Sequence, residues 1–172
     1  MDSNIYPVGK FEYGKSYTEA DNQRHIKELE LFPKQLIAIA SELTEDLLLE
    51  SYRPGGWNAR QIVHHIADSH MNAYMRIKLS ITENNPVIKP YNQDLWANLE
   101  DSLKLPIECS LQLIESVHYR MVYLLKTLDT ASLQRKYIHP EYNREFKLDE
   151  LLALYAWHGK HHAGHLTVII NS

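Results

Sequence analysis

Residues 155 to 165 read Tyr155-Ala156-Trp157-His158-Gly159-Lys160-His161-His162-Ala163-Gly164-His165, with four histidines inside eight positions. The stretch lies within residues 148 to 170, where apolar side chains recur at helical spacing and only two glycines interrupt them. On a helix His161 and His165 are about 6 Å apart along the axis and share nearly one face, so their imidazoles converge. Because a catalytic zinc-type site usually has three protein ligands and an open position, this pair predicts half of a metal site.

A second predicted helix, from Asn58 to about Ile81, offers the missing ligand. It has an apolar stripe and, beside it, a polar stripe made of Gln61, His65, Asp68, Asn72 and Arg76. A metal-bound histidine commonly donates its other ring nitrogen to a carboxylate, so His65 and Asp68 are a candidate ligand and its partner. The alternative is an ordinary solvated helix face, with Asp68 paired to Arg76 or Lys78.

Two more long helices are indicated by apolar periodicity. One starts near Ser16, where Ser16-Tyr17-Thr18-Glu19 has capping-box spacing, and continues to about Ile39 with Pro33 as a possible kink or break. The other extends from about Glu108 to Leu128. Short helical turns are expected over residues 47 to 49 and from Asn92 toward Leu99.

The segment before the last helix is not helical in pattern. Residues 135 to 147 contain two short β-like runs around Glu141-Tyr142-Asn143, which predicts a small hairpin or an extended loop. The fold class is therefore all-α, with four long helices, one long crossover and this insertion. In such bundles metal sites are built from side chains on facing helices. If the second and last long helices pack together, His65 meets His161 and His165.

Composition limits the other possibilities. We expect one domain over residues 1 to 172, with residues 1 to 15 as an N-terminal arm, because 172 residues with 44% hydrophobic content bury a core. No apolar run approaches the roughly 18 residues of a membrane span. The net charge is −4 and the 18 Lys and Arg are dispersed, which argues against nucleic acid. Without a signal-peptide pattern, and with Cys109 as the single cysteine, the cytoplasm is the expected location.

These motifs, taken in order, resemble the YfiT-type branch of the DinB-like metal-dependent enzymes over nearly the whole chain. The resemblance is carried by residues 6 to 11 (YPVGKF), residues 52 to 72 (YRPGGWNARQIVHHIADSHMN), residues 89 to 91 (KPY), His139-Pro140, and residues 157 to 165. It implies a DinB-like four-helix bundle that holds one divalent metal ion, zinc first and nickel second. Carried over to this sequence, the implied ligands are His65, His161 and His165.

The other histidines on the two helices are assigned less sharply. His64 points about 100° away from His65, so both cannot face one ion. We expect His158 to line the pocket. For His162 and His70 two positions stay open: the protein surface, or a place directly behind the metal ligands. A weaker alternative is that these histidines only bind adventitious metal at a surface.

The resemblance implies an enzyme that acts on a small molecule, and it implies a homodimer. Three neutral imidazoles leave an ion able to activate water for hydrolysis or to hold a thiolate. The family is described as metal-dependent hydrolases, and relatives resemble S-transferases that use small thiols such as bacillithiol. The alternative from another class is a non-catalytic, metal-stabilised binding or stress-response module.

Several further residues are candidates at this site. We assign Asp68 the catalytic role of orienting a ligand or accepting a proton. Asn72 and Arg76 continue its face and are candidates for an anionic substrate group, against a solvated-face alternative. Four more side chains are candidates for the pocket wall or mouth, with core or loop positions as the alternative: Trp57, Tyr91, His139 and Trp157.

Overall fold

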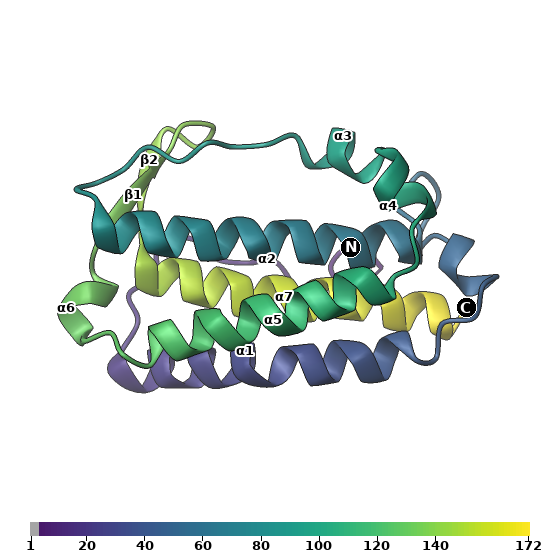
Figure 1. The fold of residues 1–172 in the computed structure, drawn as a ribbon, viewed down its shortest axis with the longest axis horizontal. Helices are drawn as coiled ribbons and strands as arrows, with labels where there is room; N and C mark the ends of the chain where they lie inside the picture. Colours follow the sequence, from purple (N-terminus) through teal and green to yellow (C-terminus); the bar gives the residue numbers. More distant parts are fainter. Residues whose placement is uncertain (1–3) are drawn as a thin grey trace.

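The computed structural model describes residues 4–172 and contains four long helices (Figure 1). These are α1 (Glu19–Ala40), α2 (Ala59–Thr82), α5 (Glu108–Leu125) and α7 (Leu148–Ile170). α1 packs against α5 and α7, and α2 packs against the same two helices, so the order around the bundle is α1, α5, α2, α7. The predicted all-α four-helix bundle is confirmed. The predicted contact between the second and last long helices is present.

Short elements fill the connections. η1 (Leu47–Leu49) follows α1, while α3 (Gln93–Ala97) and α4 (Glu100–Lys104) lie on the crossover that passes along the outside of α2 (Figure 1). After α6 (Thr130–Leu133), the strands β1 (Lys136–His139) and β2 (Arg144–Lys147) pair antiparallel, so the insertion is the predicted hairpin. The third long helix ends at Leu125, three residues before the predicted Leu128.

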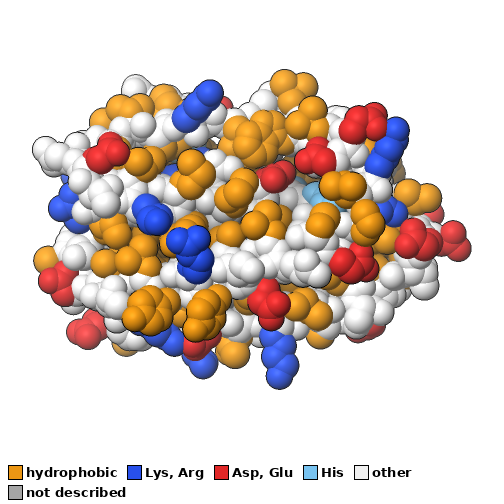
Figure 2. All heavy atoms as spheres, in the orientation of Figure 1, with side chains coloured by type: hydrophobic (Ala, Val, Ile, Leu, Met, Phe, Trp, Pro, Cys, Tyr) orange, Lys and Arg blue, Asp and Glu red, His pale blue; other side chains and the backbone are white. Residues whose placement is uncertain are grey.

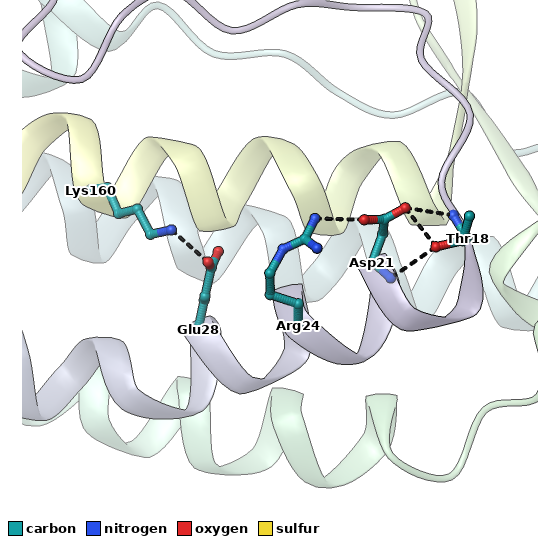
Figure 3. Close-up of polar contacts among 5 residues, drawn as sticks. All are labelled: Thr18, Asp21, Arg24, Glu28 and Lys160. Carbon is teal, nitrogen blue, oxygen red and sulfur yellow. Dashed lines mark hydrogen bonds and ion pairs between the residues drawn. The ribbon is translucent and has the colours of Figure 1, made fainter.

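The start of α1 corrects one prediction. The capping residue is Thr18 rather than Ser16: its side chain accepts from the backbone N–H of Asp21 at 3.2 Å, and the Asp21 carboxylate accepts from the Thr18 N–H at 2.9 Å (Figure 3). Asp21 stands three residues after the cap, where a capping box needs its acceptor. The Thr18 hydroxyl donates to the same carboxylate and lowers the pKa of Asp21. Figure 3 also shows Lys160 of α7 paired with Glu28 of α1.

Histidines divide the bundle core into two apolar clusters. One cluster lies at the hairpin end and includes Leu29, Met121 and Leu152; the other lies toward the far end and includes Leu36, Ile62 and Leu166. Between them in every long helix except α1 the core residues are histidines, with His70 and His118 almost fully buried. The histidine layer therefore lies inside the protein at mid-length. On the outer face in Figure 2, acidic, basic and apolar side chains are interspersed.

The two glycines of the histidine stretch are required by close approaches. A Cβ on Gly159 would meet the Phe32 ring of α1 at 2.8 Å, and one on Gly164 would meet Pro7 of the N-terminal arm at 2.7 Å. The arm is further held where the Trp157 indole N–H donates to the Gly9 carbonyl at 3.1 Å. α7 therefore contacts both α1 and the arm through backbone that carries no side chain. Across the described residues no helix combines the length and apolar character that a membrane crossing needs.

Candidate metal centre

Three histidines from two helices converge in the bundle interior: His65 and His162 are buried and His158 is half-buried. His65 of α2 and His158 of α7 bring their Nε2 atoms to 3.2 Å, and the His162 ring lies edge-on to His65 at a centroid distance of 4.8 Å. One ring nitrogen from each of the three residues falls within 4.8 Å of the other two. The spacing of one helical turn between His158 and His162 puts both on the α7 face that packs on α2.

His161 and His165, which the resemblance implied as ligands, are not grouped with His65. Within the described chain they form a second group with His162. His165 stacks on Tyr52 at 4.0 Å, and His161 stacks on Trp157 at 4.5 Å. The helical spacing fits two overlapping pairs, 158 with 162 and 161 with 165, and only the packing of α7 decides which pair faces α2. The surface position considered for His162 and His70 is excluded, because both are buried.

A chain of hydrogen bonds fixes the proton on His158, and it begins at Pro33. Pro33 lies inside α1 without ending it, and because proline has no N–H, the Leu29 carbonyl four residues earlier lacks its helical donor. His118 Nδ1 of α5 lies 2.7 Å from that carbonyl oxygen. A carbonyl only accepts, so His118 carries its proton on Nδ1 and presents Nε2 as an acceptor.

The next two rings, His70 and His158, are oriented in the same way. His118 Nε2 lies 2.8 Å from His70 Nδ1, and His70 Nε2 lies 3.2 Å from His158 Nδ1. Burial lowers the pKa of His118 to about 4 and those of His70 and His158 well below the usual value, so the rings are neutral. Each neutral ring donates from Nδ1 and accepts at Nε2. His158 Nε2 is thus left with a lone pair, which faces His65 Nε2 at 3.2 Å and lies 3.4 Å from the Ser69 hydroxyl oxygen.

A shorter chain orients His162 in the same way. His165 Nε2 lies 3.2 Å from the Ile5 carbonyl oxygen, so it donates there, and its Nδ1 accepts from His162 Nδ1 at 3.3 Å. Burial lowers the pKa of both rings, so each is neutral. His162 Nε2 is then also a lone pair. Imidazoles held in this way are typical of metal ligands, and His165 holds the His162 ring in one tautomer.

The donor set fits a divalent transition metal. Burial, with His161 as a smaller cause, lowers the pKa of His65 to about 3, and burial also lowers the pKa of His158 and His162. All three rings are therefore neutral at neutral pH. Two nitrogens bound to one tetrahedral zinc ion at about 2.0–2.1 Å each are roughly 3.3 Å apart. The observed separation of 3.2 Å between His65 Nε2 and His158 Nε2 agrees with that value.

Two adjoining cavities meet at His158. One, of about 360 Å³, extends from His158 toward the hairpin; the other, of about 350 Å³, extends past His162 toward the N-terminal arm. Both are lined by His158, Trp157 and Gln93. The aromatic residues expected at the pocket do line it: Trp157 lines both cavities, Tyr91 the first and Trp57 the second. His139 of the hairpin also reaches the first cavity.

Asp68 lies on α2, three residues after His65. Its half-buried carboxylate lines neither cavity, and burial followed by the nearby charge of Asp101 raises the pKa of Asp68 to about 6. Asn72 uses its amide to donate to the backbone carbonyl of Asp68 at 2.9 Å. Arg76, the last residue of the predicted polar stripe, is buried in the first cavity. The catalytic role of Asp68 therefore stays a prediction.

Sequence reasoning missed His118 completely. It is the histidine of α5, and no ligand spacing on its own helix marks it. The available signal was Pro33 inside a helical pattern, since a proline there predicts a carbonyl in need of another donor. Which side chain donates to that carbonyl depends on the contact between α1 and α5.

Comparisons with known proteins identify the family of this chain. A family model described as the DinB superfamily matches residues 28–166. The chain is similar to a Bacillus mycoides (strain KBAB4) protein named "Putative metal-dependent hydrolase", with 47% identity over 162 residues, 94% of this chain and 92% of the relative. A Halalkalibacterium halodurans protein of the same description is 47% identical over 163 residues, 95% of this chain and 94% of the relative.

A solved structure has nearly the same fold. It is that of YfiT from Bacillus subtilis, described as "a probable metal-dependent hydrolase with an unusual four-helix bundle topology". The TM-score is 0.94 at 38% sequence identity, and the match covers 97% of this chain and 95% of the YfiT chain.

Proposed function

From the premise that this chain belongs to the DinB superfamily, with relatives named for metal-dependent hydrolysis, we propose that it is a metal-dependent hydrolase of a small molecule. One observation carries the proposal: the Nε2 atoms of His65 and His158 converge to 3.2 Å where two cavities meet. A buried group of neutral imidazoles beside open space is the arrangement of a catalytic rather than a structural metal site.

We propose His65, His158 and His162 as the ligands of one divalent ion. Zinc is the first choice because neutral imidazole nitrogens suit it, and nickel is the alternative. Such an ion, when bound, polarises a substrate oxygen and activates a water molecule for attack. The set His65, His161 and His165 remains the competing assignment, and single-residue variants distinguish the two.

The surrounding side chains have definable tasks in this proposal. His70 and His165 hold the two α7 ligands in one tautomer and orientation, which keeps their lone pairs available. The indoles of Trp57 and Trp157 wall the cleft and reduce its water content. Asp68 is proposed as the group that accepts a proton, because a pKa of about 6 allows exchange near neutral pH.

The test is a substrate panel with the metal-loaded protein. One arm contains ester and amide substrates, the other a small thiol with an electrophile, and mass spectrometry follows both. Hydrolysed product in the first arm supports the proposal, provided that His158→Ala abolishes it and His64→Leu does not. His64 is a buried control because its ring bonds Ser110 and the Leu105 carbonyl instead. A product that carries the thiol would instead identify an S-transferase. No turnover at full metal occupancy would identify a non-catalytic module.

A homodimer is proposed separately, on the basis of the family resemblance. Light scattering coupled to size exclusion measures it directly. A mass of twice 20.1 kDa supports the dimer, and a mass of 20.1 kDa refutes it.

A further inference from the structure

We propose that the cavity between His158 and the hairpin binds an anionic group of the substrate through Arg76. This inference rests on the proposed function, because it names the class of substrate that the same site would bind. The anion is a carboxylate, phosphate or sulfonate on a small molecule, held at one end of the cleft while the reacting bond lies at the histidines.

Arg76 is a buried cation without a carboxylate partner. Its side chain is only 9% exposed, on α2, and it lines the first cavity. Nη1 donates to the Tyr155 hydroxyl at 3.3 Å, and Nε is buried with no hydrogen-bond partner. Among the ion pairs of residues 4–172 none involves Arg76. A buried charge is costly unless it is paired, so a ligand anion accounts for its retention.

The neighbouring groups are mostly hydrogen-bond donors. His139 of β1 lines the cavity with a buried Nδ1 that has no partner, and the charge of Arg76 helps burial to lower the pKa of His139. Burial raises the pKa of Tyr91 to about 12, so its phenol stays protonated. Glu141 is the acidic residue of the lining, and its side chain is exposed in the hairpin turn. The buried wall therefore suits an acceptor that carries negative charge.

The position of Arg76 relative to the metal centre sets the size of the ligand. Arg76 follows His65 by eleven residues on α2, about 16 Å along the axis. Side chains on a helix tilt toward its N-terminus, so the guanidinium leans back toward the histidines. Tyr155, its hydrogen-bond partner, is within 5.6 Å of His158 between ring centroids. A cavity of about 360 Å³ then holds a small molecule that touches both ends.

Calorimetric titration of the metal-loaded protein with sulfate tests the subsite. Wild type is expected to bind sulfate, Arg76→Met to bind it at least tenfold more weakly, and Arg76→Lys to fall between them because it keeps charge but loses the planar fork. Arg120→Met, which removes an exposed arginine on α5, is the matched control and should bind as wild type does. Equal affinity of wild type and Arg76→Met, or no sulfate binding by wild type, overturns the proposal. Circular dichroism verifies that each variant is folded.

A pair of esters links the subsite to turnover. 4-Nitrophenyl acetate is neutral, and the mono-4-nitrophenyl ester of succinate carries a carboxylate. The kcat/KM of Arg76→Met for the succinate ester should fall at least tenfold more than its kcat/KM for the acetate. Equal losses on both esters would contradict anion recognition. If wild type hydrolyses neither ester, the proposed esterase activity is refuted. The sulfate titration then still tests whether Arg76 binds an anion.

Discussion

The carbonyl oxygen of Leu29 accepts a hydrogen bond from His118 Nδ1 at 2.7 Å, in place of the helical N–H that Pro33 lacks. This bond fixes the proton position on His118, and through two further hydrogen bonds it fixes those on His70 and His158. A proline in α1 therefore influences the orientation of the His158 ring in α7 without touching it. The histidine layer is a connected hydrogen-bond network that reaches from α1 to α7.

Removing His118 should weaken metal binding without removing a ligand. In His118→Leu, His70 loses the acceptor that orients it, and we expect metal affinity to drop about 10–100-fold, the range typical for loss of such partners. Competition with a chelator measures this affinity. His64→Leu is the control, because His64 is buried on α2 but bonds Ser110 and the Leu105 carbonyl instead. Equal affinities in the two variants would refute the orienting role.

Acid should destabilise the metal-free protein. The pKa of His118 is about 4 in the folded state, against about 6.5 in an unfolded chain. Below pH 6.5 the unfolded chain takes up a proton that the folded protein refuses, so the free energy of unfolding falls as pH drops from about 6.5 to about 4. Urea unfolding between pH 7 and pH 5 measures the slope. The slope should be shallower in His118→Leu, and an unchanged slope would contradict the assignment.

Adding a methyl group at Gly159 should destabilise the bundle. Its Cβ would lie 2.8 Å from the Phe32 ring, which is stacked on His70 and has little room to move. Overpacking costs about 1–3 kcal/mol, and the helix propensity gained from Ala returns about 1 kcal/mol, so Gly159→Ala should lose up to about 2 kcal/mol. In a Phe32→Leu background the same change should be neutral or stabilising. Denaturant unfolding measures both, and a stabilised Gly159→Ala single variant would disprove the clash.

Asp68→Asn separates a catalytic role from an electrostatic one. If Asp68 accepts a proton in the reaction, the variant loses at least tenfold in kcat/KM and the acid limb near pH 6 disappears from the pH profile. In either case the free energy of unfolding above pH 6 should rise, since a desolvated carboxylate is removed. Unchanged kcat/KM together with that rise would show that Asp68 only carries a burial penalty.

The sequence predicts the four helices well because periodicity and turn residues are local. The predicted cap of α1 differs from the observed one by two residues. Ser16 and Thr18 both have an acidic residue three positions later, and the extended backbone at Thr18 makes Thr18 the capping residue. The metal pair is harder, because His158 with His162 and His161 with His165 have identical spacing. Packing of α7 on α2 places His158 and His162 beside His65, and that information is tertiary. The role of His118 is invisible in the sequence for the same reason, whereas Arg76 is a sequence candidate for an anionic group and only the fold shows that it is buried.

The central claim is that His158, not His161, completes the site with His65. Metal content per chain, measured on His158→Ala and His161→Ala loaded and dialysed side by side, tests it most directly. The structure predicts that His158→Ala loses the ion while His161→Ala retains about one ion per chain. Retention by His158→Ala together with loss by His161→Ala would contradict this account and favour the set His65, His161 and His165.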